Sequence, residues 1–154
     1  MPDEQPSPES LQKMLEIQWQ DHIQTRAQTW KSLEIAALIA VAVVGVDWRF
    51  DDPRATAVAA LLLAFVALSG MGIAIKSRQV EINKFTTIRE LEKRLKLDAV
   101  VHNPDLPQPI SFWSVFSLKS NNPLFILRMH FVLFLFAIGF LAVRLLAYYG
   151  ILKR

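Results

Sequence analysis

The strongest constraint in this sequence is a run of 21 residues, from Ala55 to Ile75, that contains no charged side chain. An α-helix rises about 1.5 Å per residue, so a helix of this length spans roughly 30 Å, the thickness of a bilayer's hydrocarbon core. Glycine and proline, which interrupt helices, are absent from residues 9–44 and 73–97. Each of these stretches can therefore form one continuous helix, and the sequence predicts an all-α membrane protein.

The two long helical stretches are separated by residues 47–53, which contain three Asp and one Pro and are typical of a turn. Before this turn, residues 31–48 form an apolar segment in which Lys31 and Trp48 suit opposite membrane interfaces. We therefore predict an antiparallel transmembrane hairpin with spans at 31–48 and 55–75. Its polar extensions, residues 9–30 and 76–97, then form a stalk of two helices outside the bilayer.

Both extensions carry apolar side chains at helical spacing, which indicates a short antiparallel coiled coil, within one chain or between chains. The side chains expected in this contact are Leu15, Trp19, Ile23, Phe85, Ile88, Leu91 and Leu95. In the spans, small residues about four positions apart allow helix backbones to approach closely. The packing positions expected from this spacing are Ala36, Ala40, Ala60, Ala64, Gly70 and Gly72.

The rest of the chain divides into three parts. Residues 1–8 contain three prolines among polar side chains and predict a disordered tail. Residues 98–121 predict a proline-rich linker and then a helix in the membrane interface, where Trp113 is expected to contact lipid or a partner. Residues 122–154 begin with Asn and Pro, a helix-start signal, and predict a third transmembrane helix that faces lipid.

Positive charge decides the predicted orientation. Seven Lys and Arg residues lie in the segment 76–96, whereas the turn and the residue after it carry two Arg, Arg49 and Arg54, beside three Asp. Because Lys and Arg collect on the cytoplasmic side, we expect the N-terminus and residues 76–121 in the cytoplasm, with a bacterial inner membrane as the easiest fit. A third span then places Lys153 and Arg154 outside, against the same rule, so a shallow insertion of the last segment stays open as an alternative.

Few residues suggest chemistry. The chain has no cysteine, which excludes disulfides and thiolate sites. The histidines are isolated from one another, and Asp21 and His22 are expected to form an exposed pair. The segment 69–72 has two glycines but lacks the lysine of a phosphate-binding loop, so we interpret it as a helix-packing site. We therefore expect no catalytic residue, metal, cofactor or nucleic-acid partner, and the sequence does not predict an enzyme.

Charged side chains in the apolar segments need an explanation. Glu34, about one turn inside the first span, either pairs with Lys31 or extends to the interface, or it lines or gates a pore between copies. Arg144 either extends to lipid phosphates, pairs with a partner subunit or binds an acidic headgroup. Arg128 and His130 lie near the cytoplasmic interface, where contact with headgroups accounts for both.

Over residues 9–97, the order of long helix, short outer turn and long helix with a basic end resembles the SLATT-type bacterial membrane effectors. This resemblance is one of layout. It implies a two-span hairpin with amphipathic cytoplasmic extensions, oligomers that form pores, and a role in anti-phage and nucleotide-signal systems. The third apolar segment, from Leu124 onwards, goes beyond that layout.

Two functions follow as expectations. The first is a homo-oligomeric channel or pore-forming effector that is gated through its cytoplasmic helices. The second is an accessory or scaffold subunit of a larger membrane complex, with the stalk bound to a soluble or membrane protein partner. No span carries a periodic stripe of polar side chains, which favours the second. A hydrophobic pore that closes by dewetting would be compatible with the first.

Overall fold

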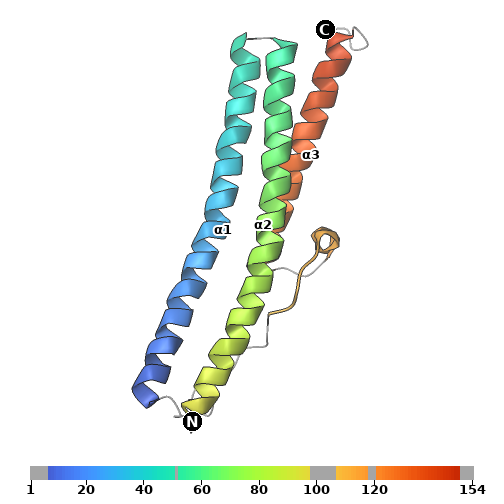
Figure 1. Ribbon diagram of the computed structural model, residues 1–154. Helices are drawn as coiled ribbons and strands as arrows, with labels where there is room; N and C mark the ends of the chain where they lie inside the picture. Colours follow the sequence, from blue (N-terminus) through green and yellow to red (C-terminus); the bar gives the residue numbers. More distant parts are fainter. Residues whose placement is uncertain (1–6, 51, 98–106, 118–120, 150–154) are drawn as a thin grey trace, which may run out of the picture.

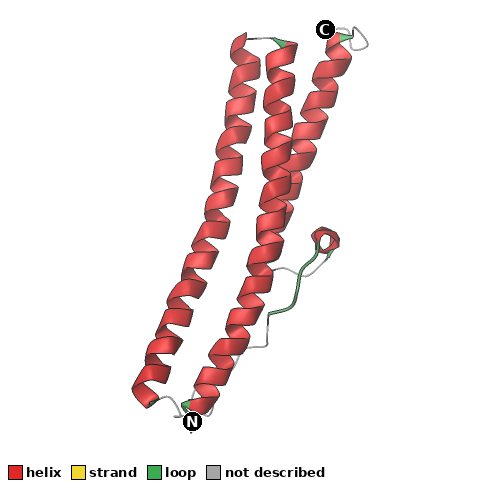
Figure 2. Ribbon diagram, in the orientation of Figure 1, coloured by secondary structure: helices red, strands yellow, loops and turns green. Residues whose placement is uncertain are grey.

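The computed structural model describes residues 7–50, 52–97, 107–117 and 121–149. Three α-helices account for most of this part of the chain: α1 (Pro8–Phe50), α2 (Pro53–Arg94) and α3 (Asn122–Tyr148) (Figure 1). A short 3₁₀ helix, η1 (Phe112–Phe116), lies between α2 and α3 in the sequence. The described residues contain no strand (Figure 2), so the predicted all-helical class is confirmed.

All three α-helices begin at a polar cap followed closely by proline. Ser7 Oγ accepts a hydrogen bond from the Ser10 backbone, and Asp52 Oδ1 accepts one from the Arg54 backbone. At α3 the capping side chain is Asn121, whose Oδ1 accepts from Leu124 N at 3.0 Å, one residue before the predicted cap. Such caps satisfy backbone N–H groups that have no partner within the helix.

The predicted turn at 47–53 is too long. Helix α1 continues to Phe50, and α2 starts at Pro53. The extra turn of α1 is stabilised from outside the helix, because Asp47 Oδ1 accepts a hydrogen bond from Thr56 Oγ1 at 2.9 Å. A side chain expected in a loop therefore joins the ends of two helices.

Helices α1 and α2 lie side by side in opposite directions, and α3 packs mainly against α2 (Figure 1). Two apolar clusters hold the three helices together. The first is centred on Val43, Ala60, Leu63, Ala64 and Ala137, and the second on Met71, Ala74, Leu124, Ile126 and Leu127. Both clusters lie along α3, the first in its second half and the second at its start, where it packs against α2.

A seven-residue repeat of buried and half-buried positions runs along both α1 and α2, and we call these positions the seam. Its positions on α1, at alternating steps of four and three, are Leu11, Leu15, Gln18, His22, Thr25, Thr29, Ser32, Ala36, Ile39, Val43 and Val46. Its positions on α2 are Thr56, Ala60, Leu63, Ala67, Gly70, Ala74, Ser77, Glu81, Lys84, Ile88, Leu91 and Leu95. Every one of these residues is buried or half-buried. A spacing of 3.5 residues keeps the same face against the partner helix, as in coiled coils.

The seam changes character along its length. Its apolar half comprises the positions from Ala36 on α1 and up to Ala74 on α2, where nearly all side chains are apolar. Its polar layer comprises Gln18, His22, Thr25, Thr29 and Ser32 of α1 with Ser77, Glu81 and Lys84 of α2. Leucine and isoleucine return beyond the polar layer, at the far end of the stalk.

The stalk stripe predicted for α1 was wrong in part. Leu15 is half-buried in the seam, and the predicted partners Trp19 and Phe85 meet edge-on with ring centroids 5.9 Å apart, but Ile23 is 64% exposed. Successive steps of four drift around the helix away from a seam with steps of four and three. The seam therefore takes Gln18 and His22. On α2, Phe85, Ile88, Leu91 and Leu95 are all buried or half-buried.

Two described helices, α2 and α3, are long and apolar enough to cross a membrane. Helix α1 is not one of the two, so the predicted span at 31–48 stays a prediction. The predicted interfacial helix is reduced to the five residues of η1. The predicted tail, most of the linker and the end of the last segment lie outside the described residues.

Candidate functional site: a buried charged layer in the stalk

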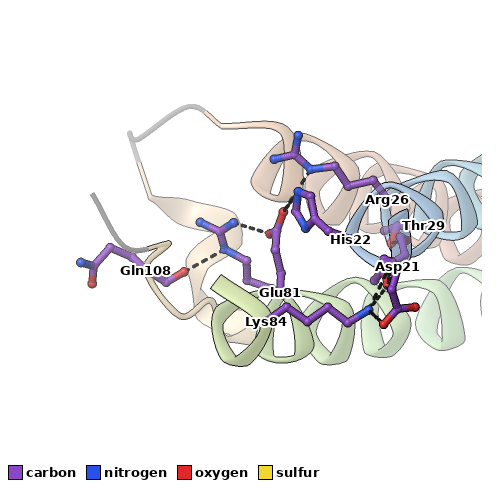
Figure 3. Close-up of polar contacts among 9 residues, drawn as sticks. Asp21, His22, Arg26, Thr29, Glu81, Lys84 and Gln108 are labelled. Atoms are coloured by element: carbon purple, nitrogen blue, oxygen red, sulfur yellow. Dashed lines mark hydrogen bonds and ion pairs between the residues drawn. The ribbon is translucent and has the colours of Figure 1, made fainter. Parts of the chain in front are cut away.

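A single buried carboxylate, that of Glu81, organises the polar layer (Figure 3). Glu81 is 5% exposed, and its Oε1 accepts a hydrogen bond from Arg26 Nε at 3.0 Å. Its Oε2 accepts from Arg78 Nη1. His22 Nε2 lies 3.8 Å from Oε1, so groups from both helices face one charge. A buried carboxylate requires such compensation, because removing it from water is costly.

Arg78 links the seam to the segment that precedes η1. It is 8% exposed, and its Nε donates to the backbone oxygen of Gln108 at 3.0 Å. Beside it on α2, Lys84 Nζ lies 2.6 Å from Asp21 Oδ2 and 2.8 Å from Thr25 Oγ1. These contacts cross from one helix to the other and fix their register at this level.

His22 is buried among aromatic rings. Its ring meets Phe85 edge-on at 4.8 Å and Trp19 at 5.8 Å between centroids. Burial lowers the pKa of His22 below its usual value of 6.5, and the charge on Arg26 lowers it further, although Glu81 acts in the opposite direction. The imidazole is therefore neutral at pH 7. Its Nδ1 is buried and has no hydrogen-bond partner among the described residues.

The expected exposed pair of Asp21 and His22 is wrong. Asp21 is exposed but bonds to Lys84, and His22 is directed into the seam. His130 was expected at lipid headgroups, yet it is fully buried, with Nδ1 2.9 Å from the Ile126 backbone oxygen. Glu81 and Arg78 were not singled out at all. The seven-residue register, followed from Leu11 and from Thr56, places both His22 and Glu81 in the seam.

The predicted packing positions are mostly buried within one chain. Ala36 and Ala60 are fully buried, Ala64 is nearly so, and Ala40 is half-buried beside them. A Cβ atom added to Gly70 would lie 1.9 Å from His130 Cδ2, so this glycine is required for the close approach of α3. Gly72 differs, because a Cβ atom there would meet nothing within 4 Å.

Arg128 and Arg144 of α3 both contact other parts of their own chain. The sequence predicted contacts with lipid or a partner subunit and not these contacts. Arg144 Nη2 pairs with Asp47 Oδ2, which ties the end of α3 to the end of α1. Arg128 donates from Nε to the backbone oxygen of Val115 at 3.2 Å and from Nη2 to that of Ser117, at the end of η1. Trp113 is 75% exposed on η1.

Glu34 is exposed on α1, and the predicted pair with Lys31 is not formed in the described part of the chain. Its role as a pore or gating residue stays a prediction. Among the described residues, no group of three or more His, Asp or Glu side chains could hold a metal ion.

Searches of protein-family models, curated proteins and solved structures found no match to this chain. The resemblance to SLATT-type effectors therefore stays a prediction. The site must be interpreted from its own geometry: one carboxylate faces two guanidinium groups in a layer that joins α1, α2 and the segment before η1.

Proposed function

We propose that the chain is an integral membrane protein whose apolar half lies in the bilayer and whose stalk extends into the cytoplasm. Large exposed apolar side chains support this, including Leu38, Val41 and Phe65. Soluble proteins rarely expose such a continuous apolar surface. Exposed aromatic residues lie at both ends of it, with Trp30 at one end and Trp48 at the other. These two are separated by about 27 Å along α1, close to the hydrocarbon thickness.

Within this frame, we infer that copies of the chain assemble into a homo-oligomer that acts as a channel or pore-forming effector, gated through the stalk. The observation that carries this inference is the exposed outer side of α1. Met14 and Ile17 are about half exposed in the aqueous half of the helix, and Glu34 is exposed at the edge of the apolar surface. A second copy would cover the two apolar side chains and bring Glu34 carboxylates together around an axis.

The faces available for assembly are limited by what already packs inside the chain. Ala60, Ala67 and Gly70 of α2 pack inside the chain and are buried, so this small-residue face cannot line an axis between copies. Assembly must instead use α1 and the outer side of α2. The polar layer lies directly below the proposed bilayer, where a movement of the stalk would be transmitted among α1, α2 and the segment before η1 through Arg78 and Glu81.

A second function, an accessory or scaffold subunit, is favoured by one observation. The exposed surface of the apolar half carries large aliphatic and aromatic side chains and shows no polar stripe among the described residues. Such a surface suits lipid or a neighbouring transmembrane protein better than a water-filled pore. In that case Met14 and Ile17 would contact a different protein.

The mass of the detergent-solubilised protein, measured by light scattering with the micelle subtracted, separates the two functions. We expect a discrete homo-oligomer of the wild type, and dissociation of a Met14→Ser/Ile17→Ser variant. A Gln20→Ser/Gln24→Ser variant, changed at exposed polar positions of the same helix, should keep the wild-type mass. A monomeric wild type would overturn the homo-oligomer and favour the accessory subunit.

Conductance in planar bilayers then tests the pore. Replacement of Glu34 by Gln should change the unitary current or its ion preference, because the ring of carboxylates loses its charge. Glu90→Gln, at an exposed position of the stalk, is the matched control and should conduct as the wild type does. An oligomer without current, or one in which both variants behave alike, would argue against Glu34 as the pore residue.

A further inference from the structure

Two adjoining cavities lie beside the polar layer where α1, α2 and the start of α3 meet. The larger, about 450 Å³, is lined by Arg26, Arg78, Phe85, Pro107, Asn121, Asn122 and Pro123. The smaller, about 40 Å³, shares Arg26, Arg78, Asn122 and Pro123 with it and is also lined by His22 and Glu81. The larger cavity has the size of a small-ligand site, and the smaller has room for one or two water-sized groups.

The charges that face these cavities do not cancel. From α1 come Arg26 and the neutral His22, and from α2 come Arg78 and Glu81. Lys84 lies next to them, but its charge is compensated by Asp21 at 2.6 Å. One carboxylate therefore balances two guanidinium groups. The lining contributed by α3 has no charged side chain.

The guanidinium groups retain free donors. Arg26 uses only Nε on Glu81, and its two terminal amino groups form no hydrogen bond with the described residues (Figure 3). Arg78 uses Nε on Gln108 and Nη1 on Glu81, which leaves Nη2. Guanidinium groups with neighbouring free N–H donors match the oxygen atoms of a phosphate.

Two further observations indicate an anion with polar atoms. The N-terminus of α3, a helix of 27 residues, lies at the cavities through Asn121 and Asn122, and this end of a helix carries partial positive charge. Independently, His22 lines the smaller cavity while 3% exposed, and its Nδ1 has no partner in the described part of the chain. A ligand oxygen or a ligand-bound water at this position would satisfy that atom.

We propose that the junction of α1, α2 and the N-terminus of α3 binds a phosphate group through Arg26 and Arg78. The site lies about 6 Å along α1 from Trp30, whose ring packs 6.0 Å from that of Phe125. In the proposed bilayer this is the level of the headgroups. The phosphate is therefore supplied either by an anionic lipid or by a soluble phosphate compound that enters from the cytoplasm. The proposal does not depend on the oligomeric state.

The test is a thermal-unfolding titration of the purified full chain in detergent, with three additives: phosphatidylglycerol, phosphatidylcholine and inorganic phosphate. We expect phosphatidylglycerol to raise the Tm of the wild type more than phosphatidylcholine does. For Arg26→Gln the apparent affinity for phosphatidylglycerol should fall by about tenfold, the loss expected for a charge-assisted hydrogen bond. Arg94→Gln, an exposed arginine at the end of α2, should bind as the wild type does.

A second variant keeps the proposal testable if Arg26→Gln unfolds. Asn122→Asp places a negative charge at the cavity, in the first turn of α3, where an acidic side chain is compatible with helix formation. It should also lose binding while retaining its helical content. Stabilisation by inorganic phosphate at least equal to that by the lipid would identify a soluble source. Equal binding by Arg26→Gln and Arg94→Gln, or no stabilisation of the wild type by any phosphate compound beyond phosphatidylcholine, would overturn the site.

Discussion

In the apolar half of the seam the repeat carries Ala36, Val43, Ala60 and Ala67, whereas a few turns away the same repeat carries His22 and Glu81. The backbone geometry is continuous through both, because each helix extends unbroken for more than 40 residues. What differs is how the contact is stabilised. Small residues allow close packing and strong dispersion contacts, while the polar layer relies on a few directed hydrogen bonds.

The same seven-residue register therefore supports apolar packing in one half and specific polar pairing in the other. The apolar half tolerates any side chain of suitable size and shape. Around Glu81 the polar layer requires groups that compensate the buried charge, and the contact with Arg26 then fixes which parts of α1 and α2 face each other. A buried polar group at one position of a repeat is a known way to fix register, at a cost in stability.

The largest effect is expected from removal of the charge in the polar layer. Glu81→Gln leaves the buried Arg78 without its carboxylate, and breaking a buried pair costs about 3 kcal/mol of unfolding free energy. Glu90→Gln, an exposed control on the same helix, should change stability by less than about 0.5 kcal/mol. Denaturant unfolding in detergent measures both. Equal stabilities would mean that the polar layer does not hold the stalk together.

The second prediction tests the close packing of α2 against α3 at Gly70. Gly70→Ala places a Cβ atom 2.1 Å from His130 Nε2 inside a fully buried contact, and such overpacking costs about 2 kcal/mol. Gly72→Ala, two residues away, meets open space and should stabilise the helix by about 0.5 to 1 kcal/mol. Each variant adds a single methyl group, at positions two residues apart. A destabilisation of both by the same amount would show that close approach to α3 is not what requires Gly70.

The apolar half and the polar layer also differ in how far the sequence alone predicted them. The uncharged run from Ala55 to Ile75, the turn at 47–53 and the helix-start signal at Pro123 are local signals, and they predicted the helices and the all-helical class. The polar layer was missed because hydrophobicity alone was used to choose the buried face. His22 and Glu81 look like surface residues unless the seven-residue register is extended from the apolar ends.

The pair between Arg144 and Asp47 could not be predicted for a different reason. The two residues are 97 positions apart, and only the folding of α3 against α2 brings them together. A charged side chain in an apolar segment indicates that a partner is needed, but the sequence does not say which one. The cavity beside Arg26 has the same origin, because its lining comes from all three helices and from Pro107.

The third prediction concerns the pair of Arg144 and Asp47. This pair lies outside the seam, at the end of the apolar half, where it joins α3 to α1. Asp47→Asn keeps an acceptor oxygen for Thr56 but replaces the oxygen opposite Arg144 by an NH2 group, which removes both the charge and the acceptor for that arginine. The expected loss is about 1.5 kcal/mol, smaller than for Glu81, because Arg144 is partly exposed and can extend to water. In an Arg144→Gln background the same change should have a smaller effect. Identical losses in both backgrounds would show that the pair contributes nothing.

The smallest effect tests the neutral histidine of the polar layer through pH. Because burial lowers the pKa of His22 below 6.5, the unfolded chain takes up a proton that the folded chain resists as the pH falls through 6.5. The stability due to the neutral imidazole is therefore fully present above pH 6.5 and decreases below it. Between pH 6.5 and about 5.5 the wild type should lose up to about 1 kcal/mol relative to a His22→Gln variant.

The control for this titration is Gln24→His, which adds an exposed histidine on the same helix. A histidine with the same pKa in the folded and unfolded states binds protons equally in both, so this variant should follow the wild-type pH dependence. Parallel curves for the wild type and His22→Gln would mean that His22 accepts its proton as readily in the folded stalk as in the unfolded chain. The charge of Glu81 would then dominate over burial, and the polar layer would be more accessible to water than its contacts with Trp19 and Phe85 indicate.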